Sequence, residues 1–210
     1  MHLRALASDS VFSRLSRNTL TLLVSNGGGA LLSFALSVLI GRALGEDGLG
    51  VYAAALAWVF PLWLLAEFGF ETLITREVAQ NPTAAPDYLR AAAIARLTLG
   101  GGLMLLLLLA APFITDDAVL AQGLRIAAPL IVVGPFASAF SAVFRAHRVM
   151  WPVAALNIGM LALQLPLTAL VLVQGGGVLA ALAVNTLTSA GQLVAAWAIY
   201  RVRFQAQARA

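Results

Sequence analysis

The sequence predicts an all-α protein, a polytopic transmembrane bundle of six helices. Three observations lead to this fold class: the composition, six long apolar stretches and the placement of the arginines. Apolar residues make up 61% of the 210 residues, charged residues only 10%, and the mean hydropathy is +0.91. Soluble domains carry about 25% charged residues and rarely expose large apolar patches. This composition argues against a soluble enzyme, a disordered chain or a nucleic-acid-binding domain, so no nucleic-acid partner is expected.

Each apolar stretch is long enough to cross a hydrocarbon core of about 30 Å at about 1.5 Å per helical residue. The short connections between them contain Gly, Pro, Asn and Asp, residues typical of turns. The expected spans are 18–43, 49–75, 88–111, 119–144, 151–173 and 178–200.

The arginines predict the orientation. With six crossings, only Arg42 and Arg125 fall on one side of the membrane, and the other eleven arginines fall on the opposite side. Positive charge is typical of the cytoplasmic side, so both termini are expected to be cytoplasmic. The eleven are Arg4, Arg14, Arg17, Arg76, Arg90, Arg96, Arg145, Arg148, Arg201, Arg203 and Arg209.

The chain divides into three parts by composition. Residues 1–17 are expected to form a basic amphipathic helix that lies on the membrane surface; a disordered basic leader is the alternative. This segment lacks the apolar core and cleavage site of a secretory signal. Residues 18–200 form the six-span domain, and 201–210 a short cytoplasmic tail.

Polar side chains inside the apolar stretches are candidates for a binding site, because they are costly in lipid unless they find a partner or a water-filled cavity. Glu67 lies about 13 Å from Arg76 along a helix. Two kinds of role stay open for Glu67. It is either structural, as an ion pair or a protonated, hydrogen-bonded carboxyl, or functional, as a proton or cation site or a group that positions a cavity arginine. The paired amides favour interhelical hydrogen bonds, and a water-lined cavity wall is the alternative. The intramembrane candidates are Asn26, Glu67, Glu71, Asn157, Gln164, Asn185 and Gln192.

No catalytic or metal-binding constellation is visible. The chain has no Cys, its only histidines are His2 and His147, and it contains no Walker or dinucleotide-binding motif. We therefore expect no enzymatic activity, no metal and no resident cofactor.

The segment Gly41–Gln80 carries a specific pattern: a span ends in Arg-x-Leu-Gly, an acidic pair follows, Gly-x-Tyr opens the next span, and a glycine-containing exit precedes Thr-Arg-Glu. This hairpin resembles the first hairpin of bacterial polysaccharide exporters, the oligosaccharide flippase family of the multidrug/oligosaccharidyl-lipid/polysaccharide exporter group. The loop Phe144–Arg148 is also similar to the family's inner loop. The matching hairpin residues are Arg42, Leu44, Gly45, Glu46, Asp47, Gly50, Tyr52, Gly69, Thr75, Arg76 and Glu77.

The resemblance implies a carrier in the inner membrane that flips lipid-linked oligosaccharides on polyprenyl pyrophosphate during the synthesis of lipopolysaccharide or another cell-surface polysaccharide. Family members have two helical lobes that work by alternating access. Arginines suit pyrophosphate because the guanidinium is always charged and donates in a planar fork. Arg42 and Arg76 are therefore further binding candidates, with interfacial anchoring as the alternative.

The chain matches only the amino-terminal lobe of such carriers. It is expected to be a fragment, a half that forms a homodimer, or a lobe completed by a separate polypeptide. A coupling proton or Na⁺ is considered at Glu67. The alternative functions are half of a multidrug or cation extruder, a non-transporting membrane scaffold, and an inactive remnant.

Overall fold

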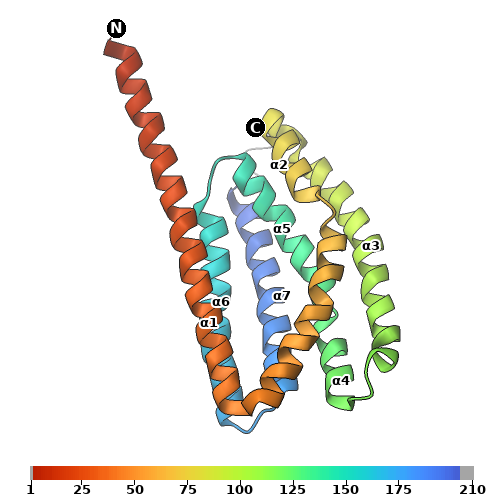
Figure 1. Cartoon of the computed structure of the whole chain (residues 1–210). Coiled ribbons are helices and arrows are strands. Elements are labelled where there is room, and N and C mark those ends of the chain that lie inside the picture. The colour runs from red at the N-terminus through yellow and green to blue at the C-terminus, as the bar shows by residue number, and fades with distance from the viewer. Residues whose placement is uncertain (1, 204–210) are drawn as a thin grey trace.

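The computed structural model describes the backbone of residues 2–203, with the side chains of residue 23 and of residues 25–203. This part of the chain is helical, with no strand, as predicted (Figure 1). The side chains of the expected amphipathic leader at 1–17, and residues 204–210 of the expected tail, lie outside the described residues. The elements are α1 (His2–Glu67), α2 (Phe70–Gln80), a 3₁₀ turn η1 (Pro82–Ala84), α3 (Ala85–Ile114), α4 (Ala118–Ala127), α5 (Leu130–Ala146), α6 (Trp151–Val173) and α7 (Val178–Arg203).

Helix α1 is two membrane-length arms joined at Gly45. The backbone there has φ 72° and ψ −173°, a region that essentially only glycine adopts. Figure 1 shows the chain reversing direction at this end of α1, so that its two arms meet at the turn and diverge toward the opposite end of the bundle. The described residues contain five helical segments that are long and apolar enough to cross a membrane, and the 56-residue Ser25–Gln80 segment is one of them. Because this segment folds back at Gly45, the bundle has the six crossing arms that the sequence predicts.

Two further breaks interrupt crossing arms. Phe68 (φ 36°) and Gly69 (φ 73°) separate α1 from α2, and Pro129 follows the end of α4 and precedes α5. Proline lacks the N–H that a continuing helix requires, which explains the second break. By contrast, α1 continues through Pro61 and α6 continues through Pro166. The second arm is therefore broken near its carboxylate residues rather than at its proline.

The buried apolar side chains form two clusters, one at each end of the bundle. The first joins α1, α3, α4, α5 and α7 and contains, among others, Ile40, Ala55, Leu124, Ile131 and Leu182. The second joins α2, α3, α5, α6 and α7 and contains, among others, Ile74, Ala92, Val143, Phe144 and Val153. The break at Phe68–Gly69 separates the parts of the second arm that belong to the two clusters.

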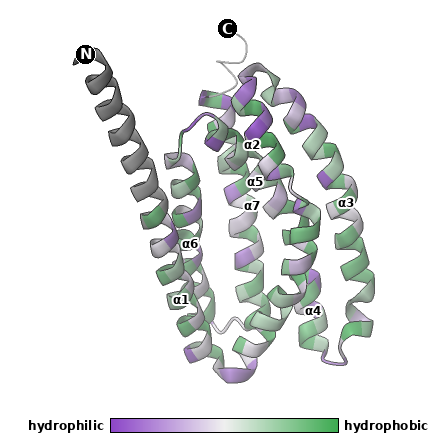
Figure 2. Ribbon diagram, turned by 45° about the horizontal axis from the view of Figure 1, so that its top comes forward, coloured by the Kyte–Doolittle hydropathy of each residue, from purple (hydrophilic) through white to green (hydrophobic). Residues whose placement is uncertain are grey.

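Large apolar side chains also cover the outside of the bundle. Phe113 is 90% exposed and Leu109 73% exposed, and Figure 2 shows hydrophobic colour along the outer faces of the helices. Such a surface is stable in hydrocarbon and unstable in water. The protein is therefore a multi-pass membrane protein, and the two ends of its described part, residues 2 and 203, lie at the same end of the bundle (Figure 1).

The geometry at Gly45 leads to a stability prediction. We expect Gly45→Ala to lower the free energy of unfolding by about 1–3 kcal/mol, because a Cβ is strained in this backbone conformation. Gly50→Ala is the control, since Gly50 has ordinary helical backbone and open space around it, and we expect it to leave stability unchanged or raise it. Thermal unfolding in detergent checks both; equal effects of the two substitutions would contradict the assigned turn.

Candidate functional site

A buried ion pair lies at the break of the second arm. The Arg96 guanidinium of α3 donates from Nη2 to Glu67 Oε1 at 2.7 Å, and Ser138 Oγ of α5 donates to Glu67 Oε2 at 2.7 Å. The side chains of Arg96 and Glu67 are 1% and 9% exposed. A buried charge is costly unless it is paired and hydrogen-bonded. Both carboxylate oxygens of Glu67 accept a hydrogen bond, and one of these comes from the oppositely charged Arg96. The cluster therefore joins three crossing arms at the point where one of them is broken.

Arg96 does not lie where the sequence predicts. The sequence places it at the membrane interface with the other arginines, but it lies eleven residues inside α3 and is buried. Its guanidinium also lies over the Phe70 ring, 5.7 Å from the ring centroid. The reason is Glu67: an intramembrane carboxylate provides the partner that keeps this arginine away from the interface.

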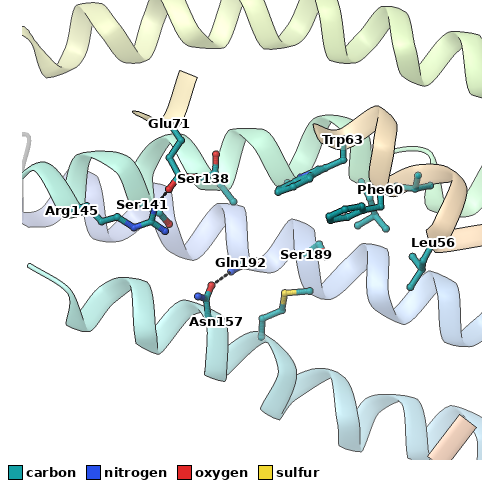
Figure 3. A pocket seen from close by; sticks show the side chains of 15 residues that line it. Leu56, Phe60, Trp63, Glu71, Ser138, Ser141, Arg145, Asn157, Ser189 and Gln192 are labelled. Carbon is teal, nitrogen blue, oxygen red and sulfur yellow. Dashed lines mark hydrogen bonds and ion pairs between the residues drawn. The ribbon is translucent and has the colours of Figure 1, made fainter. Parts of the chain in front are cut away.

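A cavity of about 490 Å³ lies among the helices (Figure 3). It is lined from five helices, with apolar side chains along one part and polar side chains along the other. The polar lining residues are Glu71, Ser138, Ser141, Arg145, Asn157, Ser189 and Gln192, and the others are Leu56, Val59, Phe60, Trp63, Leu130, Gly134, Ala137 and Met160. This size and mixture of surfaces is typical of a small-molecule site.

Two polar pairs face this cavity. Glu71 of α2 forms an ion pair with Arg145 of α5, and both side chains are about one-third exposed. Gln192 of α7 donates to Asn157 of α6 at 3.4 Å. Figure 3 shows the ion pair and the amide pair along one side of the cavity. The cavity therefore presents both hydrogen-bond donors and acceptors, while the charges of Glu71 and Arg145 neutralise each other.

An aromatic pair forms the opposite part of the lining. Phe60 and Trp63 are stacked with ring centroids 5.6 Å apart and planes 19° apart. The Trp63 indole lies directly on Gly134 of α5, where a Cβ would collide with the indole nitrogen. Because Gly134 has no side chain, the tryptophan can pack flat against α5. The cavity thus has a rigid apolar face opposite its polar one.

Tyr52 of α1 is the centre of a third polar group that is separate from the cavity lining. Its hydroxyl accepts hydrogen bonds from Asn185 Nδ2 at 3.1 Å and from Gln164 Nε2 at 3.4 Å. All three side chains are buried. These two predicted amides therefore join α1, α6 and α7 as interhelical hydrogen bonds, the first of the two interpretations that the sequence allows.

The remaining predicted residues lie apart from the cavity. Asn26 is exposed on the first arm of α1, and Arg42 is exposed near the turn at Gly45. Arg76 is exposed and pairs with Glu77 at 2.7 Å. Of the nine predicted residues, the structure brings Glu71, Asn157 and Gln192 together around the cavity, whereas Glu67 reaches its edge only through Ser138.

Other residues of the cavity lining were not predicted from the sequence. They are Arg145, the aromatic pair Phe60 and Trp63, and the serines Ser138, Ser141 and Ser189. Arg145 was counted as one of the loop arginines, and Phe60 and Trp63 look like ordinary apolar residues of a span. One signal was available: Glu71 is an intramembrane carboxylate without a basic neighbour one turn away, which calls for a partner on another helix. Within the residues whose positions are described, no group of three His, Cys, Asp or Glu could hold a metal ion.

A helical bundle with long apolar helices and a partly polar cavity defines the class of protein: a multi-pass membrane protein. Comparison with known families matches residues 15–210 to the family described as polysaccharide biosynthesis protein, and the chain belongs to that family. Neither the curated proteins nor the solved structures contain a match. The resemblance seen in the Gly41–Gln80 hairpin is thereby confirmed at the level of the family.

The buried pair gives a stability prediction. We expect Glu67→Gln to lower the free energy of unfolding by about 3–5 kcal/mol, because it leaves the Arg96 charge buried without a counter-charge. Replacing both residues, as E67Q/R96M, should cost less than the sum of the single changes. Glu77→Gln, which breaks the exposed pair with Arg76, should cost at most about 1 kcal/mol. Thermal unfolding in detergent measures these three variants and the single variant R96M; an additive double variant would show that the two charges do not interact.

Proposed function

We propose that this chain is a lobe of an inner-membrane flippase that moves lipid-linked oligosaccharides on polyprenyl pyrophosphate during the synthesis of a cell-surface polysaccharide. The observation that carries the proposal is the cavity: seven polar side chains surround a space inside an otherwise apolar bundle. A sugar is a polar group with apolar ring faces, so the Phe60–Trp63 pair and the opposing amides suit its two kinds of surface. A transport role fits better than a catalytic one, because the site lacks a paired nucleophile and base among the described residues.

The charges favour an anionic cargo over an organic cation. A cation extruder needs an unpaired carboxylate in its cavity, but the Glu71 carboxylate is neutralised by Arg145. An anionic pyrophosphate can instead compete with Glu71 for the guanidinium, whose fork of donors matches phosphate oxygens. Arg145 takes the pyrophosphate-binding role in this proposal, and Arg42 and Arg76 act as interfacial anchors.

Broken helices give the lobe places to bend. The second arm is interrupted at Phe68–Gly69 and the fourth at Pro129, and residues of both arms line the cavity. Transporters that rock between inward-open and outward-open states commonly use such discontinuous helices. We propose that this lobe rocks against a second one, supplied by another copy or another polypeptide. The end of the bundle that carries Arg90, Arg148 and Arg201 is then the cytoplasmic end, with both termini on that side.

Binding of a lipid-linked saccharide tests the proposal directly. The chain in lipid nanodiscs should bind a polyprenyl pyrophosphate that carries a fluorescent oligosaccharide, and Arg145→Gln should weaken this binding about 10- to 100-fold, as expected for the loss of charged hydrogen bonds. Arg76→Gln, an exposed arginine outside the cavity, is the control and should bind as the unchanged chain does. Preferential binding of tetraphenylphosphonium would favour the extruder instead, and binding of neither probe would favour the scaffold.

We also propose that a proton or Na⁺ couples at Glu71 rather than at Glu67. Glu67 has both oxygens occupied and is buried, whereas Glu71 faces the cavity. Neutralising Glu71 releases Arg145 for the pyrophosphate. The unchanged chain should therefore bind the pyrophosphate probe more tightly as pH falls or Na⁺ rises, and Glu71→Gln should bind it tightly under all these conditions. Glu77→Gln should behave like the unchanged chain; if Glu71→Gln also retained the ion dependence, Glu71 would not be the coupling site.

A further inference from the structure

A second cavity of about 400 Å³ lies between α3 and α7, which both pack against α5. It contacts Phe136, Ala139 and Phe140 on α5, whereas the polar cavity contacts Gly134, Ser138 and Ser141 on a different face of the same helix. Its other lining residues are Leu89, Ala93, Arg96, Leu193, Val194 and Trp197. We call this second cavity the α3–α7 groove. It is distinct from the proposed transport site.

The walls of the α3–α7 groove are hydrocarbon, and it opens toward the lipid. Val194 is 63% exposed and Trp197 46% exposed on its α7 side. Every lining residue except Arg96 is apolar. An open apolar groove within the membrane-spanning segments suits a hydrocarbon chain, since a chain held there contacts protein on several sides.

Two arginines lie at the mouth of this groove. Arg90 follows the lining residue Leu89 by one position on α3, and Arg201 stands over the Trp197 ring at 4.8 Å from its centroid. Both guanidiniums are exposed, and the acidic partner of Arg90 is the equally exposed Asp87 at 3.9 Å. Tryptophan and arginine gather where a helix leaves the hydrocarbon core. The mouth is therefore a cationic edge at headgroup depth.

The floor of the groove contains one charged residue, Arg96. Arg96 lines it, and its Nε and Nη1 atoms are buried with no hydrogen-bond partner among the described residues. Arg96 lies six residues below Arg90 on α3, about 9 Å along the helix.

We infer that the α3–α7 groove is a binding site for an anionic phospholipid of the leaflet at which α7 ends. One acyl chain lies along Phe136, Phe140 and Leu193, and the phosphate lies between Arg90 and Arg201. The charge at the mouth selects an anionic head over a zwitterionic one. The site does not depend on the proposed transport function, because it uses neither the polar cavity nor its residues.

Quenching of Trp197 by brominated lipid tests the inference. In a chain whose only tryptophan is Trp197 (W58F/W63F/W151F), brominated phosphatidylglycerol in phosphatidylcholine vesicles should quench at a mole fraction at least about fivefold lower than brominated phosphatidylcholine does. The further changes R90Q/R201Q should abolish this preference. R42Q/R125Q, which removes two exposed arginines from the other end of the bundle, should preserve it.

A second pair of variants tests the groove itself. Ala93→Phe fills it and should reduce quenching by the anionic lipid, whereas Ala91→Phe, an exposed alanine of α3 outside the groove, should not. Equal quenching by both brominated lipids would overturn the inference. It would also be overturned if polyprenyl phosphate displaced the brominated phosphatidylglycerol and unlabelled phosphatidylglycerol did not, because the site would then belong to the cargo.

Discussion

The architecture depends on the buried ion pair between Arg96 and Glu67. Arg96 and Glu67 would each be unstable in hydrocarbon, and together with Ser138 they form a buried, hydrogen-bonded cluster. The cluster lies where the second arm is broken and where the two apolar cores meet, so it holds α3 and α5 against the free ends of the broken helix. With that joint fixed, Glu71 at the start of α2 is directed toward the cavity and toward Arg145.

The polar residues of the bundle then separate into structural and functional groups. Tyr52 and Asn185 are buried and hydrogen-bonded to each other between helices, whereas Glu71 and Arg145 at the cavity are about one-third exposed. The difference matters for transport, because a group can receive cargo only if its present hydrogen bonds can be released. The outer surface has a different chemistry again: hydrocarbon along the spans and arginine with tryptophan at their ends.

The sequence predicted the membrane spans and the turns well, but not which polar side chains contact each other across helices. Span number and boundaries follow from the length of apolar runs, and the turn at Gly45 lies within the glycine-rich connection that was expected. The position of Glu67 deep within a predicted span showed that it needs a partner. Which residue is that partner depends on how α3 is rotated against α1, and no local sequence pattern encodes this rotation. The same applies to Arg145, which resembles any loop arginine. Asn26 shows the opposite case, since this predicted residue is exposed and does not line the cavity.

The central claim is that a water-accessible polar cavity lies inside a lipid-facing bundle. The chain contains no cysteine, so single cysteines can be introduced without background. Ser141→Cys lies in the cavity, and Leu106→Cys lies on the outer surface of α3, where Leu106 is 58% exposed. In intact membranes, a water-soluble maleimide should label the cysteine at position 141 and leave the one at position 106 unlabelled until detergent denaturation. Labelling at 106 with protection at 141 would contradict the account.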